Sequence, residues 1–321
     1  MASPTEPLTI VLGIDAGGTK SRALVAQRGL DGRFCVLGSG LAGPGNPLGC
    51  GVQQAAEAIG QAASQAIEQA RHAVGDPRIE PNAALVAVAG AADPVTRQRL
   101  TEALQRHPAL GRCTVTPDYA PLFCLAPDGE PAIALIAGTG ATALARDSDG
   151  QVWRAGGWGY LLGDDGSGFA LGRAAVRQAL ADRDSGVEAS PLTRALCEGL
   201  GVDDPADLTA TVYRSSDSRH ALAALARIVC EAAETDTAAQ SLVQSEAKAL
   251  AGHAAGACRA AGIERSPASL VFAGTLAIAN RVFREAVTQS LVASGTSLAA
   301  CHLAHDPAEL TLQLACRPSD G

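Results

Sequence analysis

Aromatic side chains are scarce in this chain of 321 residues, which contains 2 Trp, 3 Tyr and 5 Phe. Alanine is the commonest residue, so we expect a core built from small side chains and close backbone approaches. Aromatic residues that stack on bases and a basic surface mark most nucleic-acid-binding proteins. Here 33 acidic residues outnumber 25 basic ones, which gives a formal net charge of −8. The composition therefore argues against a nucleic-acid partner.

Long apolar runs and paired cysteines are also lacking. No stretch reaches the roughly 18 apolar residues that span a bilayer, and the start of the chain has no basic segment of the kind that opens a signal peptide. The 9 cysteines include no C-x-x-C pair, so we expect scattered thiols rather than a disulfide framework or a zinc cluster. These absences predict a cytoplasmic protein without a membrane partner.

Short strand-like runs alternate with longer helix-like runs along the chain. A strand, a Gly/Thr turn, a second strand and an Asp-Gly turn occur in this order twice. The two Gly/Thr turns hold residues 17–19 and 138–140, about 120 residues apart. Such an internal repeat indicates a duplicated supersecondary unit. We therefore expect two α/β lobes, residues 1–119 and 120–321, with a cleft between them.

The first Gly/Thr turn lies in a run of eight residues that ends at Lys20. It is not a P-loop, because Thr19 precedes the lysine and a strand follows instead of a helix. The amides of Gly17, Gly18 and Thr19 can still form a nest for phosphate oxygens. Asp15, at the end of the preceding strand, is placed to hold Mg²⁺, as in sites with few carboxylates. The alternative is an ordinary tight hairpin, and this run alone leaves both open.

The second Gly/Thr turn, Gly138-Thr139-Gly140, partly matches the dinucleotide-binding fingerprint. A strand follows it where that fingerprint requires a helix, which excludes a Rossmann site. Two hairpin tips that bind phosphate, one from each repeat, would suit a nucleoside triphosphate.

Residues 156–168 are the most unusual stretch of the sequence. They combine several glycines with Trp158, one of only 2 tryptophans, and with the acidic pair Asp164-Asp165. Carboxylates that accept hydroxyl hydrogens beside an aromatic ring suit a sugar. The spacing does not match a calcium loop. The alternative is an ordered glycine loop in front of the helix expected from residue 169.

Asp118 and Asn46 are the other candidates. Asp118 ends a strand and precedes a short helix, where it could serve only as the N-cap. The same helix N-terminus would keep it ionised and ready to accept a proton from a hydroxyl group. Asn46 lies in a Gly/Pro loop, where most asparagines form only Asx turns.

Together these segments resemble the sugar-kinase branch of the actin/hexokinase superfamily. More narrowly they resemble the BadF/BadG/BcrA/BcrD ATPase family, which includes N-acetylglucosamine and glucosamine kinases. The resemblance covers nearly the whole chain, and residues 157–168 are its most specific part. It implies an α/β fold of two ribonuclease H-like lobes, the actin-like ATPase/sugar kinase fold, around a central cleft. It also implies that ATP and Mg²⁺ are used to phosphorylate an amino sugar, N-acetylglucosamine, at its 6-hydroxyl, and we expect a homodimer.

The resemblance also assigns roles to residues. Asp118 would be the base that acts on the sugar hydroxyl, and Asp15 would hold Mg²⁺. The nucleotide would be bound by Gly17, Gly18, Thr19, Lys20, Gly138, Thr139, Gly140, Gly274 and Thr275. The sugar would be lined by Asn46, Asp118, Gly157, Trp158, Gly159 and Asp164.

Three departures from the family pattern bear on substrate and nucleotide affinity rather than on the reaction class. Ala141 stands where relatives often have a serine, Asp165 where glutamate is commoner, and residues 307–311 replace a Gly-Ala segment. A glucosamine kinase is the nearest rival, since Asp165 could face a free amine. A redox-enzyme activator ATPase would need cysteine thiolates for an iron–sulfur cluster, and Cys113 and Cys124 lack cluster-like spacing. A non-catalytic sugar sensor would be expected to lose Asp118 or the hairpins.

Overall fold

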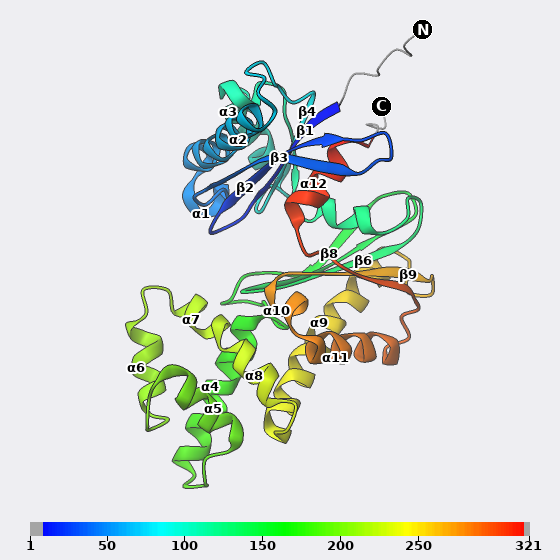
Figure 1. The fold of residues 1–321 in the computed structure, drawn as a ribbon. Helices are drawn as coiled ribbons and strands as arrows, with labels where there is room; N and C mark the ends of the chain where they lie inside the picture. The colour runs from blue at the N-terminus through cyan, green and yellow to red at the C-terminus, as the bar shows by residue number, and fades with distance from the viewer. Residues whose placement is uncertain (1–8, 318–321) are drawn as a thin grey trace. The chain divides into compact units, whose positions relative to one another are not determined.

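The computed structural model describes residues 9–317. Contacts within the chain divide it into two compact units (Figure 1). Unit 1 contains the chain up to Cys124 together with the C-terminal segment from Asp306, and unit 2 runs from Leu125 to His305. Each unit has one five-stranded sheet and its own hydrophobic core.

The sheet of unit 1 has the order β3-β2-β1-β4-β5. Its strands are β1 (Thr9–Ala16), β2 (Ser21–Arg28), β3 (Phe34–Ala42), β4 (Ala83–Val88) and β5 (Thr114–Pro117). The first three form an antiparallel meander, whereas β4 and β5 run parallel to β1. The carboxyl ends of β1, β4 and β5 therefore meet at one edge of the sheet.

Helices cover both faces of this sheet. The helical segments are α1 (Pro47–Cys50), α2 (Val52–Val74), α3 (Pro94–Leu104), η1 (Pro108–Leu110), η2 (Ala120–Leu125) and α12 (Pro307–Ala315). Leu12 and Ile14 of β1 pack in the core cluster that contains the buried face of α2. Val11 of β1 and Leu24 of β2 point to the other face, where Leu312 of α12 covers them.

Small residues let α2 lie directly on β3. A Cβ added to Gly40 would lie 2.0 Å from the carbonyl oxygen of Ala62, and one on Gly38 would lie 2.1 Å from that of Ala66. Ala62, Ala66 and Ala70 are fully buried on the facing stripe of α2. The alanine-rich composition therefore builds the close-packed core that the sequence predicts.

The sheet of unit 2 repeats the plan of unit 1. Its order is β10-β9-β6-β7-β8, with an antiparallel meander β6-β7-β8 and parallel β9 and β10. The strands are β6 (Ala132–Ala137), β7 (Ala141–Arg146), β8 (Val152–Gly156), β9 (Ala268–Ala273) and β10 (Leu298–Leu303). The identical order and directions confirm the internal repeat. Strands β8 and β10 were not expected from the sequence.

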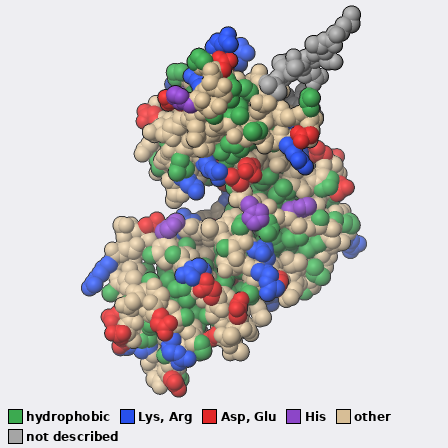
Figure 2. All heavy atoms as spheres, viewed as in Figure 1, with side chains coloured by type: hydrophobic (Ala, Val, Ile, Leu, Met, Phe, Trp, Pro, Cys, Tyr) green, Lys and Arg blue, Asp and Glu red, His purple; other side chains and the backbone are tan. Residues whose placement is uncertain are grey.

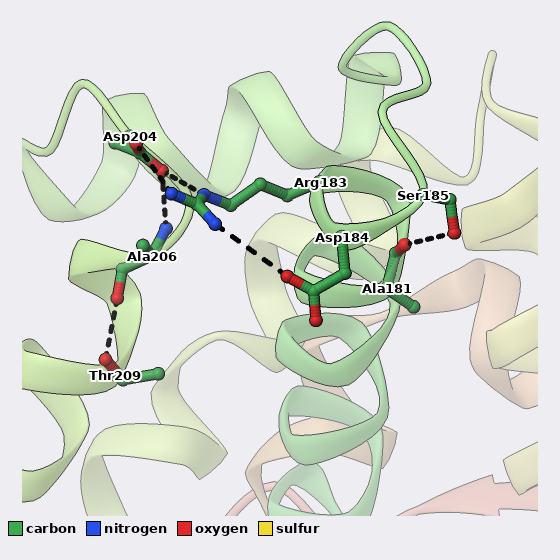
Figure 3. Close-up of polar contacts among 7 residues, drawn as sticks. All are labelled: Ala181, Arg183, Asp184, Ser185, Asp204, Ala206 and Thr209. Atoms are coloured by element: carbon green, nitrogen blue, oxygen red, sulfur yellow. Dashed lines mark hydrogen bonds and ion pairs between the residues drawn. The ribbon is translucent and has the colours of Figure 1, made fainter.

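Unit 2 has more helices than unit 1, because α4 to α8 are inserted between β8 and α9. The helices of unit 2 are α4 (Gly168–Asp184), α5 (Pro191–Leu200), α6 (Asp207–Arg214), α7 (Ser218–Ala224), α8 (Ala226–Ala232), α9 (Thr237–Ala260), α10 (Thr275–Ala279) and α11 (Arg281–Ala293). Arg183 in the last turn of α4 reaches Asp204, which precedes α6, through two hydrogen bonds of 2.7 and 3.3 Å (Figure 3). Asp204 also accepts from the amide of Ala206 at 2.8 Å, so this cluster fixes the connection between the two helices.

Two expectations about organisation need correction. The lobe boundary expected between residues 119 and 120 falls after Cys124, and the segment from Asp306 belongs to unit 1 rather than to the second lobe. The physical reason is the apolar face of α12, which packs on β1 and β2. The short helix after Asp118 is a 3₁₀ helix and begins at Ala120.

Charged side chains of both signs are interspersed on the face shown in Figure 2, without a continuous basic surface there. Among residues 9–317, no helix is long and apolar enough to cross a membrane. All nine cysteines are free thiols, as the sequence predicts.

Candidate active site

Unit 1 gathers polar groups at the carboxyl edge of its sheet. Asp15 is the penultimate residue of β1, and Asp118 directly follows β5. The backbone of this edge is tied together: the amide of Asp118 donates to the carbonyl of Val88 at 3.2 Å, and the amide of Ala89 donates to that of Ala16 at 2.9 Å. This edge is where ligands bind in parallel α/β sheets.

The hairpin tip between β1 and β2 lies at the same edge. The amide of Gly17 donates to the carbonyl of Lys20 at 2.9 Å and closes the turn, while its own carbonyl accepts from Gly45 at 2.9 Å. Gly18 is exposed, with no atom within 4 Å of the place where a Cβ would stand. The predicted phosphate hairpin of unit 1 is thus an open turn held from behind by the loop that carries Asn46.

Asn46 does make the Asx-type contact considered from its sequence. Its Oδ1 accepts from the amide of Leu48 at 2.9 Å and caps α1. A Cβ on Gly90 would lie only 2.4 Å from that same Oδ1, so the loop after β4 passes close to Asn46. Gly90 has φ +84°, in the region that favours glycine. Sequence analysis missed Gly90, since a single Gly after a strand is also an ordinary turn residue.

Asp15 has a perturbed acidity. Burial raises the pKa of its carboxyl from 3.8 to about 6, with further raising by the charges of Asp118 and Asp306 and partial lowering by Lys20 and Arg22. Asp306, the N-cap of α12, pairs with Arg22 at 2.7 Å. A carboxyl whose charge is disfavoured by its surroundings is suited to a cation.

The donor set of this edge fits Mg²⁺ better than a metal that needs many protein ligands. Within residues 9–317 no group of three or more His, Cys, Asp or Glu side chains is arranged to hold a metal. Mg²⁺ usually takes one or two carboxylates and keeps several waters. Asp15 would hold it in this way.

Unit 2 has a cavity beside its own hairpin. The cavity measures about 270 Å³ and brings Gly138 and Thr139 of the hairpin next to Thr275 at the start of α10. Its remaining lining is Gly168, His220, Ala223, Ala224, Ala226, Arg227, Leu276, Ala279 and Asn280. Three residues that the family resemblance assigns to the nucleotide, Gly138, Thr139 and Thr275, therefore share one pocket.

Gly274 shapes this pocket through its backbone. It has φ +87°, and a Cβ on it would lie 2.5 Å from the carbonyl oxygen of Ala137. Only glycine lets the end of β9 approach the end of β6 so closely. The wall residues Arg227 and Asn280 were missed by sequence analysis, because Arg227 lies in α8 and Asn280 between α10 and α11, in segments that carry no motif.

The loop of residues 157–167 lies between β8 and α4. Its first residues, around Trp158, are exposed, and its last residues are held by hydrogen bonds and ion pairs. Trp158 is 70% exposed, and the guanidinium of Arg154 lies 5.6 Å from its ring centroid. Gly157 and Gly159 have φ of +70° and +86°, which glycine adopts without strain. Arg154 also donates to the carbonyl of Gly157.

At the end of this loop nearest α4, Glu246 of α9 accepts from the amide of Gly166 at 2.7 Å, and burial raises the pKa of that glutamate. Asp165 lies 3.8 Å from His253 of the same helix and is about half exposed. Asp164 is different: it is only 4% exposed, and its carboxylate pairs with Arg219 of α7 at 3.0 Å. The two neighbouring acids therefore have different surroundings.

Two copies of one mixed sheet, each with a glycine hairpin after its first strand, define the class of actin-like ATPases and sugar kinases. The expected α/β fold is thereby confirmed. The chain belongs to the BadF/BadG/BcrA/BcrD ATPase family, whose model matches residues 12–297. The family resemblance inferred from the sequence is confirmed.

The curated relatives of this chain are named as amino-sugar kinases. An N-acetylmuramic acid/N-acetylglucosamine kinase of Clostridium acetobutylicum is 27% identical over 219 residues, which are 68% of this chain and 69% of that protein. An N-acetyl-D-glucosamine kinase of Dictyostelium discoideum is 37% identical over 81 residues, 25% of each chain. The crystal structure of a proposed N-acetylglucosamine kinase from Chromobacterium violaceum matches with a TM-score of 0.69 and 26% identity, over 96% of this chain and 99% of that one.

Proposed function

We propose that this protein transfers the γ-phosphoryl group of ATP to the 6-hydroxyl of an amino sugar, and that the sugar is N-acetylglucosamine. Membership of the family and the names of its relatives support the use of ATP and a sugar acceptor. The observation that carries the proposal is the pair of carboxylates, Asp15 and Asp118, beside an open glycine hairpin at one sheet edge.

Asp118 acts as the base in this proposal. It accepts the proton of the sugar hydroxyl as that oxygen attacks the γ-phosphorus and the bond to the β-phosphate oxygen breaks. Asp15 holds Mg²⁺, which when bound neutralises charge on the phosphates. Most of the rate enhancement then comes from position and charge rather than from covalent chemistry.

The remaining predicted residues divide between the substrates. The backbone amides of Gly17, Gly18 and Thr19, with Lys20, bind phosphate oxygens from unit 1. Gly138, Thr139 and Gly140 bind them from unit 2, and Gly274 and Thr275 lie on the adenosine side of the 270 Å³ cavity. The sugar is contacted by Asn46, Asp118, Gly157, Trp158, Gly159 and Asp164.

An N-acetylated sugar suits the glycine-rich loop better than a free amine does. The indole of Trp158 is exposed and its neighbours Gly157 and Gly159 have no side chains, which leaves room for an acetyl group. Ala141, which stands where relatives often have serine, is 5% exposed and offers no hydroxyl. Glucosamine stays the alternative, because the half-exposed Asp165 could meet an amine.

A redox-activator function is disfavoured by the thiols themselves. An iron–sulfur cluster would be held by cysteine thiolates, and Cys113 and Cys124 lack cluster-like spacing.

The expected homodimer and the cytoplasmic location stay part of the proposal. Sedimentation of the purified protein tests the dimer.

The test of the proposed function is ADP release by the purified protein with ATP and Mg²⁺. The acceptors are N-acetylglucosamine, glucosamine, glucose and a blank without sugar. Strong stimulation by N-acetylglucosamine alone is the expected result. Stimulation by glucosamine instead would keep the kinase and change its substrate, whereas equal release in every well would replace the kinase by an ATPase.

A further inference from the structure

The ion pair between Asp164 and Arg219 lies directly on the phosphate hairpin of unit 2. A Cβ built on Gly140 would lie 2.8 Å from Oδ2 of Asp164 and 2.9 Å from Nη2 of Arg219. These two atoms are themselves 3.0 Å apart. Any side chain at position 140 would therefore push the pair apart, although the backbone there has no left-handed strain.

Arg219 links two segments that are distant in sequence. It belongs to α7, its partner Asp164 lies 55 residues earlier in the glycine-rich loop, and its guanidinium stands 5.3 Å from the ring centroid of Tyr160 in the same loop. Tyr160 in turn contacts Phe169 of α4 edge to face, with centroids 5.4 Å apart. One side chain thus holds the loop from two points.

The Asp164–Arg219 pair is more buried on its Asp164 side than a surface ion pair of this protein. The Asp164 side chain is 5% exposed, and its backbone has φ +60°, the one non-glycine residue with positive φ in the part of the chain that the structure describes. Holding such a residue there requires support from its surroundings. In the pair Arg183–Asp204, which Figure 3 shows, the side chains are by contrast 45% and 51% exposed.

One hydrogen-bond donor of the Arg219 guanidinium has no partner among residues 9–317. This donor is the buried Nε. A purely structural arginine would usually have its buried donors satisfied. The bond to Asp164 is the one ion pair of Arg219 within those residues.

We propose that Arg219 is a positioning residue for the sugar: it fixes the Asp164 carboxylate, and with it the glycine-rich loop, in the orientation that meets the sugar hydroxyls. This inference deepens the proposed function and rests on it. Without the guanidinium, the Asp164 carboxylate would be a buried charge without compensation. It would then turn toward solvent and away from the sugar.

The test uses the full-length protein and three variants: Arg219→Gln, Arg219→Lys and, as a matched control, Arg183→Gln. Loss of one charge-assisted contact predicts that Arg219→Gln raises the KM for N-acetylglucosamine by about 10- to 100-fold. The KM for ATP should rise less than the KM for the sugar, because the backbone of the Gly140 hairpin, and not the guanidinium beside it, is assigned to the phosphates. Arg219→Lys should recover part of the loss, because it restores the charge without the contact between the guanidinium and the Tyr160 ring. The control removes an exposed pair and should leave both constants unchanged.

Adding Asp164→Asn to Arg219→Gln separates a positioning role from a general loss of stability. If the two residues act as a unit, the double variant loses no more sugar affinity than Asp164→Asn alone. Additive losses would overturn the inference. An equal rise in both KM values, or a wild-type sugar KM in Arg219→Gln, would overturn it as well.

A readout without catalysis keeps this inference distinct from the proposed function. With Trp153→Phe in the background, Trp158 is the sole tryptophan and reports on the loop. Arg219→Gln should lower the fluorescence anisotropy of Trp158, because the loop then moves more freely, and Arg183→Gln should not. If the wild type phosphorylates no sugar, the proposed function fails. If the anisotropy is the same with and without Arg219, the positioning role fails.

Discussion

The acidic residues at the carboxyl edge of the unit 1 sheet are assigned different roles, although their charges raise the pKa of Asp15. Asp15 is held in a buried position where Asp118 and Asp306 raise its pKa, and Lys20 and Arg22 lower it. Asp306 is engaged by Arg22 and by the start of α12. Asp118, at the end of β5, is the carboxylate assigned to the sugar hydroxyl.

Replacing Asp118 by asparagine tests the base directly. The side chain keeps its shape but can no longer accept a proton readily, so kcat should fall at least about 100-fold. Sugar binding measured by calorimetry should stay near the wild-type value. Near-normal turnover would remove Asp118 from the mechanism.

The raised pKa of Asp15 predicts a dependence of stability on pH. The folded protein keeps this proton up to about pH 6, whereas the unfolded chain loses it near 3.8. The contribution of Asp15 to the free energy of unfolding is therefore fully present below pH 4 and is lost as the pH rises through 6. The loss is on the order of 2 kcal/mol, after a discount for partial solvation. Urea unfolding at pH 4 to 7 in EDTA should show this loss in the wild type but not in Asp15→Asn, and parallel profiles would contradict the assignment.

Trp158→Ala addresses the sugar side of the site. The indole is exposed and lies in the loop assigned to the sugar, so its removal should raise the KM for the sugar more than the KM for ATP. Steady-state kinetics with each substrate varied in turn measures both. An equal rise in the two constants would argue against this assignment.

At the level of elements, close backbone contact explains why glycine and alanine occupy the positions they do. The stripe of alanines on α2 was predictable from its three- and four-residue spacing, and it is buried as expected. The partners Gly38 and Gly40 in β3 carry no such signal, because a glycine in a strand pattern also fits a bulge or a bend. The close approach depends on tertiary packing, which periodicity does not encode.

Gly40→Ala should destabilise unit 1. The added methyl group would lie 2.0 Å from the carbonyl oxygen of Ala62, so β3 and α2 must separate. Overpacking of this kind typically costs about 1–3 kcal/mol. Urea unfolding followed by circular dichroism measures the loss. The matched control is Gly111→Ala, where a Cβ would have no atom within 4 Å, and an equal effect of both substitutions would refute the packing argument.

For the molecule as a whole, the repeat was predictable and the path of the chain was not. The glycine hairpins at residues 17–19 and 138–140 predicted two equivalent sheets. The two sheets do have the same strand order. The return of α12 to unit 1 had no local signal, since an amphipathic terminal helix can cover either sheet. Similarly, the sequence could not predict that Asp164 forms a buried ion pair, because its partner Arg219 lies in an inserted helix that carries no motif.

Leu312→Ala tests the assignment of α12 to unit 1. Leu312 is 1% exposed against Val11 and Leu24, and truncation of such a side chain typically costs about 2–5 kcal/mol. Hydrogen exchange should accelerate at the amides of β1 and β2 and stay unchanged in β6 and β7. Uniform acceleration in both sheets would show that the two units unfold together.

The central claim is the transfer of phosphate to the 6-hydroxyl of N-acetylglucosamine. Correlated ¹H–³¹P NMR of the product formed from ATP, Mg²⁺ and this sugar examines the new bond itself. We expect a phosphorus signal coupled to the two protons on C6, and at least about 100-fold slower formation of that signal with Asp118→Asn. Coupling to the anomeric proton, or a signal from inorganic phosphate alone, would contradict it.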